Sequence, residues 1–179
     1  PRRRRIAAAA LALLIAGGVW AGGELRAAKR EAACAAAGTG IDPIWNAATR
    51  TQLRSVMIDS GMVDAESTFE HTAPWFDQFV ARWSTTASET CRDATITETL
   101  APERAWQIVG CLDEARAEAG ELVATLMSGE AKVLRSAASN AAQLSDPRRC
   151  GDDARLADHG SSLWSERAEV AELRRGLAR

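Results

Sequence analysis

Apolar residues recur at helical spacing along two neighbouring stretches of this 179-residue chain. In the first stretch they follow at steps of three or four: Phe69, Ala73, Phe76, Val80, Trp83, Ala87 and Cys91. In the second the steps alternate regularly: Ala105, Ile108, Leu112, Ala115, Ala119, Leu122 and Leu126. Such spacing gathers apolar side chains on one face of a helix. Because only a short link over residues 95–101 joins the stretches, the sequence predicts two long antiparallel helices.

The flanking segments also predict helices, and hence an all-α antiparallel bundle. Alternating apolar and polar runs and Asn-Gly or Asp-Gly hairpin signals are missing. Asp42 is the expected N-cap of a helix that starts at Pro43 and stops near Gly61. Pro74 either kinks the first long helix near residues 70–74 or marks its first turn.

A further helix is expected over residues 130–144, with five inward residues: Val133, Leu134, Ala137, Ala141 and Leu144. The Asp146-Pro147 dipeptide ends it. Beyond Cys150 the pattern is helical but weakly apolar.

Four arginines, Arg2–Arg5, precede a run without charge over Ile6–Gly23. A helix over that run is about 27 Å long, close to the roughly 30 Å of a bilayer's hydrocarbon core. The arginines predict a cytoplasmic N-terminus and an extracytoplasmic remainder. Two alternatives stay open: a cleaved signal peptide, which also exports the remainder, and a buried soluble helix. We therefore expect a single-pass membrane protein.

This topology divides the chain into four expected segments. Residues 1–23 form the arginine flank and transmembrane helix, and residues 24–41 a juxtamembrane helix and linker. Residues 42–158 form the extracytoplasmic bundle, and residues 159–179 a linker or the start of helical repeats. Since the chain opens on Pro1 rather than Met, we expect it to be a piece of a longer protein.

Charge and composition bear on the classes of partner and on catalysis. The net charge is -2, with 22 basic and 24 acidic residues, which gives no support to nucleic-acid binding. Tyrosine is absent and there are two histidines, so few residues suit acid–base catalysis. No nucleotide loop or nucleophile motif occurs. We expect no catalytic residue and no cofactor in this segment.

The four cysteines are Cys34, Cys91, Cys111 and Cys150. No two are close enough in sequence for a typical zinc site, and an even number in an exported chain favours two disulfides over free thiols or metal. If the two long helices are antiparallel, Cys91 and Cys111 lie level near their link. We therefore predict the pairs Cys91–Cys111 and Cys34–Cys150.

Other candidate site residues are isolated. His71 and His159 lack metal-ligand spacing. Adjacent carboxylates, Asp113-Glu114 and Asp152-Asp153, point in different directions on a helix and are interpreted as solvated. Trp75 falls off the apolar stripe, so it is either a contact for a partner or packed on a neighbouring helix.

The order of these features resembles the region that follows the catalytic domain in membrane-bound serine/threonine protein kinases of myxobacteria and relatives. The residues that carry the resemblance are Arg2–Arg5, Ile6–Gly23, Cys34, Trp45, Phe69, Phe76, Phe79, Trp83 to Cys91, Cys111-Leu112, and Leu144 to Cys150. The kinase's glycine-rich loop, strand lysine, H-R-D loop and D-F-G motif are all missing, so no catalytic role is carried over.

The resemblance implies a kinase inside the cell before Pro1, this domain outside, and tetratricopeptide-type repeats beginning near Ser161–Arg179. It predicts a non-catalytic sensor or interaction region that signals across the membrane to a protein partner or an extracytoplasmic ligand. A single span passes signals mainly by changing association, so a homodimer is expected. The alternative is a structural spacer that presents the repeats to other proteins.

Overall fold

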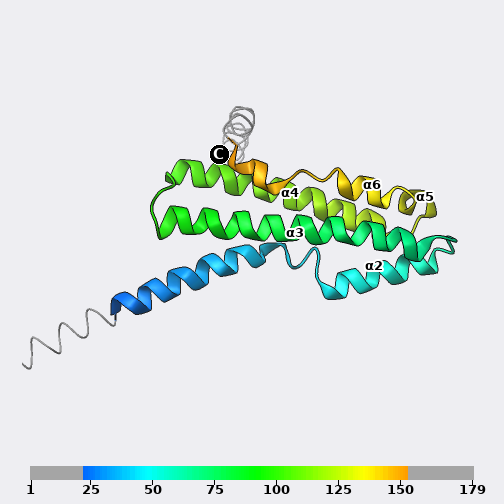
Figure 1. Cartoon of the computed structure of the whole chain (residues 1–179), viewed down its shortest axis with the longest axis horizontal. Coiled ribbons are helices and arrows are strands. Elements are labelled where there is room, and N and C mark those ends of the chain that lie inside the picture. Colours follow the sequence, from blue (N-terminus) through cyan, green and yellow to red (C-terminus); the bar gives the residue numbers. More distant parts are fainter. Residues whose placement is uncertain (1–21, 153–179) are drawn as a thin grey trace, which may run out of the picture.

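The computed structural model describes residues 22–152, whose regular elements are all helices (Figure 1). A helix over residues 22–38 comes first. It is followed by η1 (Thr39–Ile41), α2 (Ala47–Asp59), α3 (Ala65–Thr95), α4 (Pro102–Met127), α5 (Ala131–Leu134), α6 (Ala137–Ala142) and η2 (Pro147–Gly151). The all-α prediction is confirmed for this part of the chain, which contains no strand.

Helices α3 and α4 form the predicted antiparallel pair and run side by side along the length of the bundle (Figure 1). The residues of α3 that are buried exceed the predicted stripe, because Thr72 and Phe79 are buried as well. The reason is that α3 is central: it packs against α2, α4 and α6 at once. On α4, Val123 is buried where Leu122 was expected, and Leu122 is only partly buried.

One predicted helix start is wrong, and one of the two alternatives for Pro74 is excluded. Helix α2 starts at Ala47, because the Asn46 side chain, and not that of Asp42, accepts hydrogen bonds from the backbone N–H groups of Ala48 (2.8 Å) and Thr49 (3.1 Å). Of the two alternatives for Pro74, the first turn of α3 is excluded, since that helix begins at Ala65 and continues through the proline, and the kink stays a prediction.

The helix predicted over residues 130–144 is divided into α5 and α6, separated at Arg135 and Ser136. Leu134, Ala137 and Ala141 are buried as predicted. The break lets this short segment follow the surface of α3, against which α6 packs.

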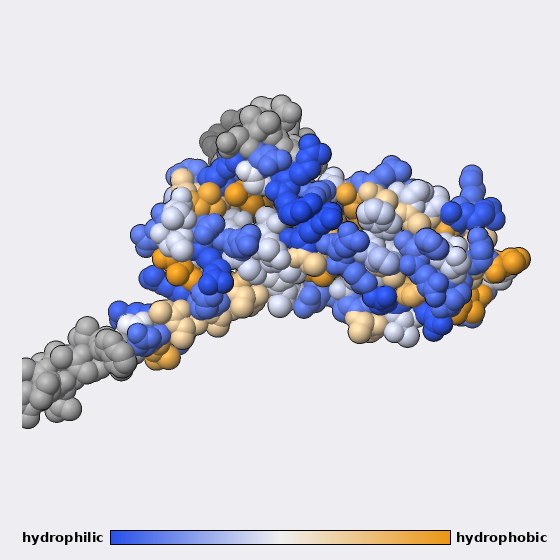
Figure 2. Space-filling view, in the orientation of Figure 1, coloured by the Kyte–Doolittle hydropathy of each residue, from blue (hydrophilic) through white to orange (hydrophobic). Residues whose placement is uncertain are grey.

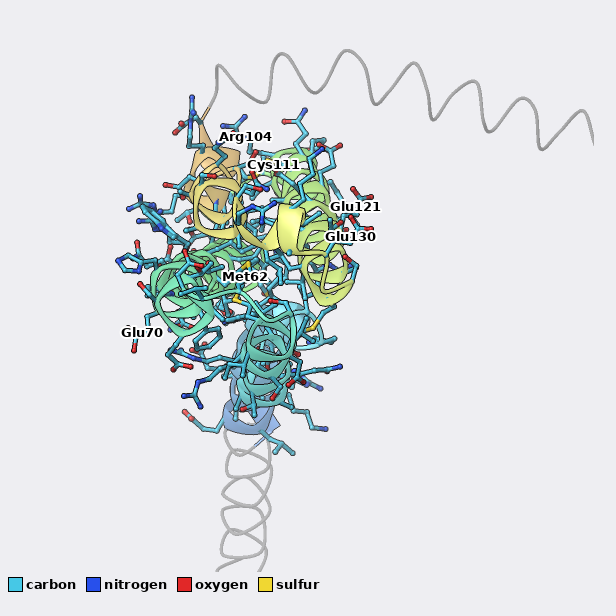
Figure 3. All side chains as sticks on the ribbon, turned by 90° about the vertical axis from the view of Figure 1, so that its right-hand side faces the viewer. Met62, Glu70, Arg104, Cys111, Glu121 and Glu130 are labelled. Atoms are coloured by element: carbon cyan, nitrogen blue, oxygen red, sulfur yellow. A yellow bond between two sulfur atoms is a disulfide. The ribbon has the colours of Figure 1, made fainter. Side chains whose placement is uncertain are left out.

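Viewed along its length, the bundle has α2 at the bottom and α3 above it, with α6, η2 and the link end of α4 at the top (Figure 3). Trp45 and Phe76 stack at 4.6 Å between ring centroids and join α3 to the segment before α2. The indole N–H of Trp45 donates to Asp77 at 2.8 Å, so this buried tryptophan has its polar atom paired.

No helix among residues 22–152 is long and apolar enough to cross a membrane. The predicted span over Ile6–Gly23 lies, except for its last two residues, outside the described part of the chain. The predicted start of helical repeats near Ser161–Arg179 and the residue His159 also lie outside it.

Candidate functional site

Two disulfides are present, as the cysteine count predicted, but the predicted pairing is wrong. The bonds join Cys34 to Cys91 and Cys111 to Cys150, with Cα atoms 5.2 and 5.6 Å apart. Cys91 lies four residues before the end of α3, whereas Cys111 lies nine residues after the start of α4. This offset of five residues is about 7.5 Å along the helix axes, so the two cysteines are not level.

Each disulfide ties an outer segment to the α3–α4 pair. Cys91 faces the helix over residues 22–38, and Cys111 faces η2, near the upper edge of the bundle (Figure 3). At the start of η2, the Asp146 carboxylate accepts hydrogen bonds from the Arg148 guanidinium and backbone N–H. These hydrogen bonds hold the pKa of Asp146 below its ordinary value, against the opposing effect of partial burial.

An apolar groove of about 360 Å³ lies beside the first disulfide, between the ends of α3 and α4 nearest their link. Its lining is formed by Ala37 of the N-terminal helix, by Trp83, Ala87, Thr90, Cys91, Ala94 and Thr95 of α3, and by Pro102, Ala105, Trp106, Val109, Leu112 and Asp113 of α4. Asp113 is the sole charged residue of this lining. The groove is therefore suited to an apolar occupant.

Two tryptophans line the groove, one buried in its wall and one exposed at its edge. Trp83 is buried, and its indole N–H donates to the Leu112 carbonyl at 2.8 Å across the α3–α4 interface. Trp106 is 73% exposed and Val109 is 41% exposed. Exposed large apolar side chains grouped around a concavity are typical of a binding surface.

The N-terminal helix is fixed tightly at its end beside the groove. A Cβ atom on Gly38 would lie 2.3 Å from the Ser88 hydroxyl and 2.9 Å from the Ser84 carbonyl oxygen, so glycine permits close contact with α3. The Glu31 carboxylate pairs with Arg92 at 2.8 Å. The Gly40 carbonyl accepts a hydrogen bond from Arg116 at 3.3 Å. The groove and the end of this helix therefore share their contacts with α3.

Of the other predicted candidates, Asp113 lines the groove, whereas Trp75 and His71 do not. Trp75 is 41% exposed on α3 and borders a cavity of about 40 Å³ beside α6 and η2, which is too small for a drug-sized ligand. The His71 ring contacts the Ser67 carbonyl of its own helix. Within residues 22–152, no three His, Cys, Asp or Glu side chains are grouped so that they could hold a metal ion.

Sequence reasoning missed Trp106, although a signal was available. Pro102, Trp106, Val109 and Asp113 follow at steps of four, three and four, which is a second helical stripe beside the one that packs on α3. Trp106 lies off the main stripe, as Trp75 does. The sequence does not show which of the two tryptophans lies beside a groove.

No known protein family matches the chain, and comparison with curated proteins and with solved structures finds no similar protein.

Proposed function

We propose that this chain is the non-catalytic, membrane-anchored sensor or interaction region of a bacterial transmembrane serine/threonine protein kinase, and that the apolar groove is its recognition site. The observation that carries the proposal is the position of the groove. Its wall includes Ala37 and Cys91, next to the point where the N-terminal helix is fixed to α3. That helix leads back along the chain toward the expected span over Ile6–Gly23.

An occupant of the groove changes the orientation of the N-terminal helix only if it binds one arrangement of this helix and the bundle more tightly than the others. An apolar molecule held between Trp106 and Ala37 contacts α4 and the N-terminal helix together. Its binding energy therefore favours one orientation of the helix relative to the bundle. A volume of about 360 Å³ lies in the range of small-molecule sites, roughly 300–1,000 Å³.

A spacer that presents C-terminal repeats needs no groove, so ligand binding separates the two functions. The full chain is labelled with 6-fluorotryptophan in lipid nanodiscs and titrated with 1-octanol, a neutral apolar probe, while fluorine NMR follows each tryptophan. We expect saturable shifts of the Trp83 and Trp106 signals and little shift at Trp75. Equal, unsaturable shifts at Trp75 and Trp106 would mean that the groove is not a site.

The kinase and topology parts of the proposal have their own tests. An in-frame kinase catalytic domain is expected in the open reading frame upstream of Pro1. A reporter active only outside the cytoplasm is expected to work when fused after Arg179. A reporter that works there only in the cytoplasm would overturn the topology.

A further inference from the structure

We infer that the groove receives the N-terminal helix of a second copy of this chain, so that two copies dimerise by each placing its helix on the other's groove. This inference rests on the proposed function, because it takes the groove as the recognition site and names its partner. It starts from two surfaces that lie unpaired in a single copy.

The first surface is the N-terminal helix itself. Residues 23–33 are all exposed, and Leu25 is 59% exposed. In Figure 1 this helix leaves the bundle and projects away from it, and in Figure 2 apolar residues follow part of its length. A stretch as short as residues 23–33 is marginal as a helix in water without packing partners. The ion pair and the disulfide that join this helix to α3 both lie in its second half, at Glu31 and Cys34.

The second argument is charge. The helix carries three cations within five residues, which we call the basic patch: Arg26, Lys29 and Arg30. None of them forms an ion pair with another residue of the described range, and at spacings of three and four they repel one another. Such a cluster is stabilised by acidic groups on whatever it packs against.

Acidic groups of this kind lie in and next to the groove. Three exposed carboxylates, which we call the acidic rim, belong to the link and to α4: Glu98, Glu103 and Asp113. Asp113 lines the groove, and Glu103 directly follows its lining residue Pro102. Within residues 22–152, Glu98 and Glu103 have no basic ion-pair partner, and Asp113 is paired with Arg116 at a distance of 3.4 Å. The basic patch and the acidic rim are complementary, and complementary charges fix the register and partner of an interface.

A single copy does not bring the two surfaces together. The Cys34–Cys91 bond fixes the end of the helix at the edge of the groove, and from there the helix runs away from the bundle (Figure 1). A second copy related by a two-fold axis pairs both sets of surfaces at once, as an isologous interface requires. Ala87, Ala94 and Ala105 keep the groove wall low enough for a helix rich in alanine to approach closely.

Photo-crosslinking tests the contact directly. The full chain is produced with p-benzoylphenylalanine in place of Trp106, and copies labelled with ¹⁴N and ¹⁵N are mixed in detergent micelles and irradiated. We expect crosslinks from position 106 of one isotope to residues 25–33 of the other. The same substitution at Trp75 is the control and is expected to give no such crosslink. Products confined to one isotope, or adducts with detergent or lipid only, would overturn the inference.

Charge reversal tests the complementarity. A reversed basic patch (R26E, K29E, R30E) and a reversed acidic rim (E98K, E103K, D113K) are each expected to weaken dimerisation at least tenfold in sedimentation velocity. Mixing the two reversed proteins is expected to restore dimers that contain one copy of each. If neither reversal changes the association, the inference is wrong.

The two proposals fail separately. The protein with the reversed basic patch keeps the whole groove lining, so 1-octanol is still expected to shift the Trp83 and Trp106 signals. If these shifts are seen but no crosslink between copies forms, the groove is a ligand site without a helix partner. If the shifts are absent from this monomeric variant as well, the proposed recognition site itself is refuted.

Discussion

Replacing Gly38 with alanine tests whether close packing holds the N-terminal helix against α3. Gly38 has helical backbone angles (φ -67°, ψ -20°), so its conformation allows any residue. By helix propensity alone, Gly38→Ala stabilises the protein by up to about 1 kcal/mol. The new methyl group, however, would lie 2.3 Å from the Ser88 hydroxyl and 2.9 Å from the Ser84 carbonyl oxygen.

The second of these contacts decides the sign. The Ser88 side chain can rotate away, but the Ser84 carbonyl belongs to the backbone of α3 and moves only if the helix moves. Overpacking of this kind costs about 1–3 kcal/mol. We therefore expect a net destabilisation of about 1–2 kcal/mol, or a decrease in Tm of several degrees for a domain of this size.

Gly110→Ala is the matched control. Gly110 lies within α4, and a Cβ atom there would meet nothing within 4 Å. It is expected to raise Tm slightly through helix propensity. Thermal unfolding of the full chain in micelles, with amide hydrogen exchange over residues 34–41, measures both variants. The reasoning is refuted if Gly38→Ala is as stable as Gly110→Ala, or if Gly38→Ala,Ser88→Ala recovers the full stability, because the Ser84 contact would then have no effect.

Three further predictions concern single contacts in the bundle. Removing the Cys34–Cys91 bond by replacing both cysteines with alanine should lower the free energy of unfolding by about 4 kcal/mol, since the bond closes a loop of 57 residues. Denaturant unfolding measures the loss. In the unmutated protein, non-reducing peptide mapping should recover this pair and Cys111–Cys150. Trp83→Phe removes a buried hydrogen bond to the Leu112 carbonyl and part of a buried ring, and should cost about 1–3 kcal/mol. Trp106→Phe, at an exposed position, should change stability by less than about 0.5 kcal/mol. Because the pKa of Asp146 is lowered in the folded state, its ionised form stabilises the fold above about pH 4, and this contribution is lost as pH falls further. Asp146→Asn should therefore reduce the loss of unfolding free energy at acid pH. An unchanged dependence of the unfolding free energy on pH would contradict this.

The sequence predicted the central helices well because their burial is periodic. Phe69, Phe76 and Trp83 recur at helical spacing, and α3 buries all three. The buried face of α3 differs from the prediction at single positions. Thr72 is buried because the helix packs on three neighbours, whereas Val80 and Cys91 are only partly buried.

The junctions were predicted less well, because they depend on where helices start. The position of Cys91 relative to Cys111 depends on the length of the link and on the first residue of α4. Because the two cysteines are offset by five residues, both predicted disulfide pairs were wrong. The groove likewise depends on where a helix ends. Trp106 becomes the edge of a concavity only because the N-terminal helix ends beside α3 at Gly38, a long-range contact that no local pattern encodes.

The two disulfides also determine how the bundle responds to a pulling force between its ends. A force applied at Cys34 and Cys150 passes through the Cys34–Cys91 bond, along residues 91–111 and through the Cys111–Cys150 bond. Helices α2, α5 and α6 and most of α3 and α4 lie in the bypassed loops and carry no tension. Complete extension therefore lengthens this path to only about 70 Å, against roughly 400 Å for the reduced chain between the same two residues. While both bonds are intact, the domain acts as a short mechanical link between the N-terminal helix and the segment after η2.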